Sequence, residues 1–204
     1  GELLTAEQVA TAFTFARQEE VDVHINSWGR PGANEAAIED AIRTNFNEGR
    51  PITEGDVTRR LGMVVVFASG NEGFEYTEEG FDYSTMPEVI GVGASNDDDV
   101  LASYSNYGVN ISVLAPSGDD FHGALISTDN EDDAGYIEDG YNVGGEGDSG
   151  NPELDSQGKY TQTFSGTSAA CPVAAGVAAI VLSVNSRLTA RDVKLILEHT
   201  CEKI

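Results

Sequence analysis

Residues 164–175 read Phe-Ser-Gly-Thr-Ser-Ala-Ala-Cys-Pro-Val-Ala-Ala, and this stretch decides the fold. A Gly-Thr-Ser turn leads into small apolar residues, and Pro172 predicts the start of a helix, where its missing N–H costs nothing. Gly166 allows the sharp bend that the turn requires. Ser168 is then expected just ahead of the positive end of the helix, which stabilises negative charge developing on a substrate oxygen. Ser168 is therefore a candidate nucleophile; the alternative is a turn that only caps a buried helix.

Two strings upstream read as buried strands that end in turns. Residues 62–73 are Gly-Met-Val-Val-Val-Phe-Ala-Ser-Gly-Asn-Glu-Gly, a continuous apolar run that breaks at Ser69-Gly70-Asn71. Residues 21–29 are Val-Asp-Val-His-Ile-Asn-Ser-Trp-Gly, a second strand pattern that ends in Ser-x-Gly. Asn71 on its own has a structural explanation, because asparagine tolerates the left-handed backbone of turns.

In this order along the chain, the three strings resemble the motifs of the subtilisin-like serine peptidases, the subtilases. The resemblance implies that Ser168 is the nucleophile and that the Asn71 amide donates to the oxyanion of the tetrahedral intermediate. Residues 86–94 and 102–116 resemble later core strands of the family, so the resemblance covers nearly the whole chain. It also implies a primary specificity pocket whose lining pairs with extended substrate like an added strand, formed by Ser27, Trp28, Gly29, Ser69 and Gly70.

The predicted elements alternate between helix and strand, which indicates a parallel sheet covered by helices. We predict an α/β, subtilisin-like three-layer fold with a mostly parallel central sheet covered by helices on both faces, in one domain over residues 1–204. The expected helices are 5–20, 34–49, a short one at 56–61, 172–184 and one after Thr189; the expected strands include 21–26 and 64–67.

A serine hydrolase needs a base for the hydroxyl proton and a carboxylate to orient that base. The resemblance implies that both precede the serine, with the base in a His-Gly-Thr-His type string. None of His24, His122 and His199 lies in such a string. We therefore expect the C-terminal part of a catalytic domain, inactive alone, whose partner is the N-terminal part with the catalytic Asp and His. A domain without any base is the alternative.

Two rival hydrolase motifs bear on the choice of nucleophile. Residues 147–152, Gly-Asp-Ser-Gly-Asn-Pro, resemble the nucleophile loop of trypsin-like peptidases and make Ser149 a second candidate nucleophile. Their surroundings, residues 129–156, have the Gly, Asp, Glu and Asn content of a solvated loop. An α/β hydrolase would need a Gly-x-Ser-x-Gly elbow, which the sequence does not contain.

The net charge of −24 makes nucleic acid and anionic membranes poor partners. Such an acidic surface is consistent with salt adaptation, calcium dependence, a preference for basic substrates, or solubility alone. We expect no membrane span, because no apolar stretch approaches the length that a span requires. Cys171 and Cys201 are both expected to be small buried residues without a disulfide.

Acidic segments at 72–82, 97–99 and 129–155 suggest structural calcium, because calcium binds clustered carboxylates and carbonyls. Asp129, Glu131 and Asp133 alternate as in a calcium loop, but Ala134 stands where an EF-hand needs glycine. Catalysis itself needs no cofactor.

We predict a secreted or extracellular serine endopeptidase acting on polypeptides, with the signal segment outside this chain. The alternative is a catalytically silent subtilase-like domain used for binding or assembly. Residues 26–29, 166–170 and 188–193 resemble the kexin-like branch of the family. That branch carries acidic residues after Ser-Trp-Gly, whereas Arg30-Pro31-Gly32 follow here, which argues against dibasic specificity.

Overall fold

The computed structural model describes residues 4–29, 35–77, 82–118, 125–128 and 160–202. His122, Ser149 and the acidic segment 129–155 lie outside the described residues. A four-stranded parallel sheet forms the centre, in the order β1-β4-β6-β8. Its strands are β1 (Val23–Asn26), β4 (Val64–Ala68), β6 (Val89–Ser95) and β8 (Ile111–Pro116).

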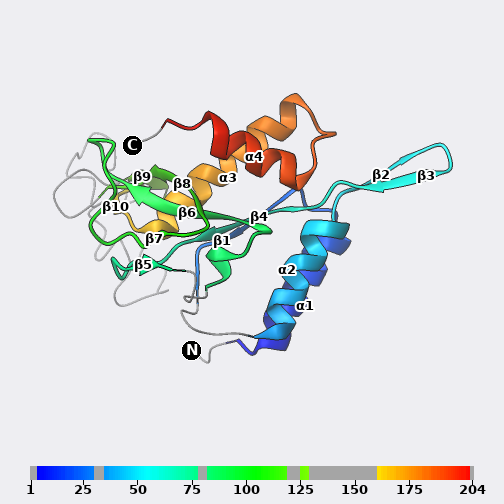
Figure 1. The fold of residues 1–204 in the computed structure, drawn as a ribbon, viewed down its shortest axis with the longest axis horizontal. Coiled ribbons are helices and arrows are strands. Elements are labelled where there is room, and N and C mark those ends of the chain that lie inside the picture. Colours follow the sequence, from blue (N-terminus) through cyan, green and yellow to red (C-terminus); the bar gives the residue numbers. More distant parts are fainter. Residues whose placement is uncertain (1–3, 30–34, 78–81, 119–124, 129–159, 203–204) are drawn as a thin grey trace.

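Helices cover both faces of this sheet, as Figure 1 shows. α1 (Ala6–Gln18) and α2 (Ala36–Glu48) pack against one face, and α3 (Thr167–Val184) and α4 (Ala190–Thr200) against the other. The three-layer α/β prediction is confirmed.

The central strand β4 is apolar throughout because both of its faces are buried. Val65 and Phe67 point into the cluster with α1 and α2, whereas Val64 and Val66 point into the cluster with α3 and α4. All four are at most 1% exposed. This alternation anchors the strand whose C-terminal end carries Asn71.

Two helix starts follow the predicted capping pattern. Thr5 and Gln8 form a reciprocal capping box on α1, and Thr189 and Asp192 form one on α4. α2 differs from the prediction, because its N-cap is Glu35, without a side-chain cap bond, and Asn34 lies outside the described residues.

The short helix expected at 56–61 is wrong. The chain forms an antiparallel hairpin there, β2 (Pro51–Glu54) and β3 (Val57–Arg60), which projects from the body in Figure 1. Gly55, at φ 62°, and Asp56 make its two-residue loop. Positive φ at a glycine in such a loop is the usual chemistry of tight hairpin turns.

Shorter elements complete the described fold. β5 (Glu75–Tyr76) pairs with β7 (Tyr107–Gly108), and β9 (Leu125–Thr128) pairs with β10 (Tyr160–Phe164). A single 3₁₀ turn, η1 (Tyr83–Thr85), precedes β6.

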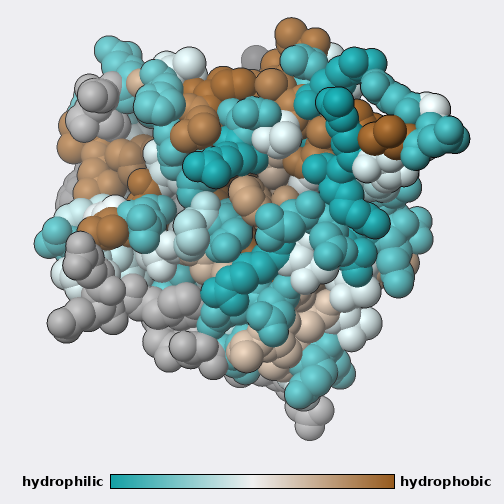
Figure 2. Space-filling view, turned by 45° about the vertical axis from the view of Figure 1, so that its right-hand side comes forward, coloured by the Kyte–Doolittle hydropathy of each residue, from teal (hydrophilic) through white to brown (hydrophobic). Residues whose placement is uncertain are grey.

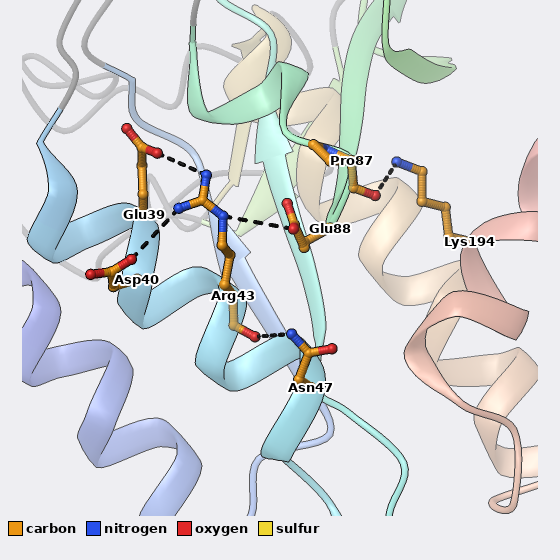
Figure 3. A network of polar contacts seen from close by, with 7 residues as sticks. All are labelled: Glu39, Asp40, Arg43, Asn47, Pro87, Glu88 and Lys194. Carbon is orange, nitrogen blue, oxygen red and sulfur yellow. Dashed lines mark hydrogen bonds and ion pairs between the residues drawn. The ribbon is translucent and has the colours of Figure 1, made fainter.

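The segment between η1 and β6 is held from both layers of helices, as Figure 3 shows. Arg43 on α2 contacts Glu88 at 3.7 Å, and Lys194 on α4 donates to the carbonyl of Pro87 at 3.0 Å. Burial lowers the pKa of Lys194, which also donates to the carbonyl of Val89 at 2.6 Å. These contacts fix the segment that follows Asp82.

α3 departs from the sequence prediction in two ways. It begins at Thr167 rather than at Pro172, so the proline lies inside the helix. It is also not buried all round, since Ile180 and Val184 are 65% and 84% exposed. By length and composition alone α3 could cross a membrane, contrary to the expectation above, but a core helix passes the same test and α3 packs on the sheet. Figure 2 shows hydrophilic residues over most of one face, with smaller hydrophobic groups between them.

Candidate active site

Ser168 is the second residue of α3, at its positive end. Gly166 caps the helix with φ at 87°, a conformation that glycine adopts without the steric cost of a side chain. A Cβ at Gly166 would lie 3.3 Å from Nδ2 of Asn71. The glycine therefore lets this backbone approach the asparagine amide.

Pro172 determines how Ser168 is held. A proline inside a helix has no N–H to donate to the carbonyl four residues earlier, which here is the carbonyl of Ser168. The hydroxyl of Ser27 donates to that carbonyl at 2.9 Å instead. In return the hydroxyl of Ser168 donates to the carbonyl of Ser27 at 3.3 Å. The start of α3 is thereby joined to the residue that follows β1.

Asn71 is fixed by Thr167, the residue before the candidate nucleophile. Its Oδ1 accepts from the backbone N–H and from the hydroxyl of Thr167, both at 2.8 Å. The hydroxyl oxygen of Thr167 also accepts from the N–H of Gly70 at 3.1 Å. With Oδ1 fully engaged, the Nδ2 group is the part of Asn71 left to donate. Asn71 does not have positive φ, whereas Gly70 does, at 101°, so left-handed backbone does not explain the asparagine.

Trp28 is positioned by its indole N–H and by its ring. Nε1 donates to Oδ1 of the buried Asn26 at 3.1 Å. The ring packs edge-on against Phe67 and Tyr83, with centroids 5.1 and 5.8 Å apart. An aromatic wall is therefore fixed beside Ser27 and Gly29.

A cavity of about 130 Å³ lies between these elements. It is lined by every candidate site residue except Ser27, and by four that the sequence analysis did not select. The candidates are Trp28, Gly29, Ser69, Gly70, Asn71 and Ser168; the additional residues are Ala68, Glu72, Asp82 and Thr167. The structure thus gathers the three sequence strings at one cavity, while their chemical roles remain predictions. Glu72 was visible beside Asn71, but no sequence pattern marked Asp82 or Thr167.

His24 is not placed to serve Ser168. It pairs in register with Val65, so it lies on the face of the sheet that α1 and α2 cover, and its ring meets Phe13 at 4.4 Å. Burial lowers its pKa, which favours the neutral ring. His199 is exposed on α4. In the described part of the chain, no histidine hydrogen-bonds to Ser168.

Cys171 lies one helical turn after Ser168 and is fully buried. Its Sγ donates to the carbonyl of Asn26 at 3.7 Å, and burial raises the pKa of the thiol to about 11. Cys201 is exposed, so the expectation of two buried cysteines is right for Cys171 and wrong for Cys201.

A family model described as the subtilase family matches residues 1–203. The chain belongs to the subtilase family. A calcium-dependent protease from Trichormus variabilis is 32% identical over 217 aligned positions, which cover 98% of this chain and 30% of the relative. A PC3-like endoprotease, variant B, from Hydra vulgaris is 30% identical and is matched over 95% of this chain and 24% of its own length. The endoprotease name gives weak support to the kexin-like resemblance.

Solved structures show the same fold. A lanthipeptide protease superimposes with a TM-score of 0.72 at 20% identity, over 98% of this chain and 60% of that protein. A protease from Pseudoalteromonas arctica has a TM-score of 0.69 at 23% identity, over 98% and 52% respectively. The subtilase chain therefore spans about a third or less of these curated relatives and little more than half of the solved ones.

The two cysteines test whether the helix behind Ser168 is packed as described. Iodoacetamide at about pH 8 is expected to modify Cys201 in the folded protein and to leave Cys171 intact until denaturant is added. A thiol pKa of about 11 leaves roughly a hundredth of the thiolate of a free thiol, and burial blocks access as well. Peptide mass spectrometry distinguishes the two sites. Equal modification of both cysteines in the native state would contradict the packing.

Proposed function

We propose that this chain carries the nucleophile and oxyanion site of a serine endopeptidase, with Ser168 forming an acyl-enzyme. The observation that carries the proposal is the bonding of Thr167 to Oδ1 of Asn71, which turns the asparagine amide toward the cavity that Ser168 lines. Family membership supports the same reaction class.

The first turn of α3 offers a second donor for the oxyanion. The N–H of Thr167 is taken by Asn71, and those of Ala169 and Ala170 bond to the carbonyl of Gly166. Among the described residues, the N–H of Ser168 has no acceptor. Negative charge on a substrate carbonyl oxygen would thus meet this N–H, the Nδ2 group of Asn71 and the positive helix end.

In the proposed reaction, Oγ of Ser168 bonds to the scissile carbonyl carbon while its proton passes to a base. The tetrahedral intermediate collapses, the C–N bond breaks, and the leaving amine takes that proton. Water then attacks the ester carbon and releases Ser168. The exposed Ser27 and Gly29, which follow β1, are proposed to pair with extended substrate.

We propose that residues outside these 204 supply the base and the aspartate that orients it. Two observations support this. The described histidines lie elsewhere, and β1 is an edge strand within the described sheet. A cavity of about 700 Å³ adjoins β1, lined by residues that include Phe13, His24 and Ile25. The N-terminal part of a catalytic domain is the proposed occupant of this edge.

The second candidate function is a silent subtilase-like domain for binding or assembly. The hydrogen bond from the Ser168 hydroxyl to the carbonyl of Ser27 favours it, because the serine here has a backbone partner in place of a base. An extracellular location remains a prediction.

Substitution of the two rival serines tests the peptidase proposal in the full-length protein. Ser168→Ala is expected to remove peptide hydrolysis, and Ser149→Ala, its matched control, to leave hydrolysis unchanged. A serine-directed phosphonate should label Ser168, as read by peptide mass spectrometry. The 204-residue chain alone should hydrolyse peptides negligibly because no base reaches Ser168. A phosphonate adduct on Ser149 would refute the assignment.

We also propose structural calcium, which is supported by the acidic sequence and by the relative named calcium-dependent protease. The described residues offer no group of three or more His, Cys, Asp or Glu that could hold a metal. The proposed ligands therefore belong to segment 129–155, outside the described residues.

Removal of calcium should lower the melting temperature, and added calcium should restore it. A ligand at 100 times its dissociation constant stabilises the folded state by about 2.7 kcal/mol, which a thermal melt detects. Molar sodium chloride is the control, because it would stabilise with or without chelator if the excess charge were only self-repulsive. An unchanged melt under chelation at moderate salt would remove the calcium proposal.

A further inference from the structure

Asp82 is a buried carboxylate that nevertheless lines the cavity beside Ser168. The residue is 2% exposed, and its Oδ1 accepts from the N–H of Ser84 at 2.9 Å as the N-cap of η1. A Cβ on Gly29 would lie 3.3 Å from Oδ2 of Asp82. The carboxylate therefore closely approaches the segment that is proposed to hold the substrate backbone.

No cation within the described residues forms a salt bridge with Asp82. Burial raises the pKa of its carboxyl group, and the nearby charge of Glu72 raises it further, while hydrogen bonds from Ser84 lower it. A carboxylate taken out of water without a counter-ion is costly. A cationic ligand in the cavity would supply that counter-ion.

Glu72 contributes a second negative charge to the same cavity. Its Oε2 accepts from Nδ2 of Asn106 at 2.7 Å, and that amide group also donates to the carbonyl of Ser69 at 3.0 Å. Asn106 is fully buried, so it fixes the Glu72 carboxylate at the end of β4. The cavity thus has an exposed acid at Glu72 and a buried acid at Asp82.

We propose that Asp82 is the specificity-determining residue of this pocket and that it selects substrates with arginine or lysine on the acyl side of the cleaved bond. The position of cleavage rests on the proposed function, whereas the affinity of the pocket for a cationic side chain does not. The guanidinium or ammonium group would lie against Asp82, with its stem along Trp28 and Gly29.

Helix capping and metal binding account for Asp82 less well than a cationic side chain does. Capping alone does not require a charge, because asparagine caps as well as aspartate. A metal ion is disfavoured, since Glu72 and Asp82 do not belong to any group of three or more potential ligands in the described structure. The net charge of −24 would in addition attract cationic peptides over long range.

Binding of p-aminobenzamidine, followed by its fluorescence, tests the pocket without catalysis. The full-length protein with Ser168→Ala should bind this amidine, and adding Asp82→Asn should weaken binding roughly 30-fold or more, as expected when one partner of a buried charge pair is lost. Asp82→Asn keeps the cap and the shape. Asp192→Asn, which also alters a capping carboxylate but lies on α4, should change binding less than about twofold.

The neutral p-aminobenzamide gives a test that needs no variant at Asp82. It should bind far more weakly than the amidine, and its binding should not depend on residue 82. Equal binding of the charged and neutral compounds, or amidine binding that survives Asp82→Asn, would overturn the proposal.

Hydrolysis of matched peptides that differ only in Arg, Lys, Phe or Leu before the cleaved bond separates the two proposals. The wild-type protein should prefer Arg and Lys in kcat/KM, and Asp82→Asn should reduce that preference roughly 30-fold or more. Hydrolysis with a preference for Phe or Leu would refute the pocket assignment and leave the peptidase proposal standing. Amidine binding that depends on Asp82 in a protein that hydrolyses none of these peptides would do the reverse.

Discussion

The two hydrogen bonds from Thr167 to Oδ1 of Asn71 are the constraint on which the site depends. They join the start of α3 to the turn after β4, two segments that are far apart in the sequence. Each such bond contributes roughly 1 kcal/mol net, so their importance lies in direction rather than stability. Because Oδ1 is used, the Nδ2 donor of Asn71 faces the cavity that Ser168 lines.

A second constraint comes from Pro172. Its missing N–H frees the carbonyl of Ser168, and the hydroxyl of Ser27 takes that carbonyl. The end of β1 is thereby held against α3, and the proposed substrate segment is fixed beside the proposed nucleophile. The same cavity then presents two opposite fields: N–H donors and a helix end on one side, and the carboxylates of Glu72 and Asp82 on the other. We infer that the first serves the substrate carbonyl and the second its side chain.

The sequence predicted the layers of the fold well, because strong local signals coincide with burial. The apolar run of β4 and the capping boxes at Thr5 and Thr189 are such signals. It misplaced features that depend on distant partners. Pro172 indicated a helix start, but Asn71 caps the preceding turn from another element. Asp82 could not be selected, since only the approach of Gly29 and its burial give it meaning. The hairpin at Gly55 was a missed local signal.

The most direct test of the account is the turnover of Asn71→Ala in the full-length protein. If the Nδ2 group stabilises the oxyanion, kcat should fall roughly 100- to 1000-fold while KM stays within a few-fold, as for loss of a donor used only in the transition state. Asn185→Ala, at the far end of α3, is the matched control and should leave kcat unchanged. A kcat for Asn71→Ala close to wild type would contradict the central claim that Asn71 and Ser168 form one catalytic site.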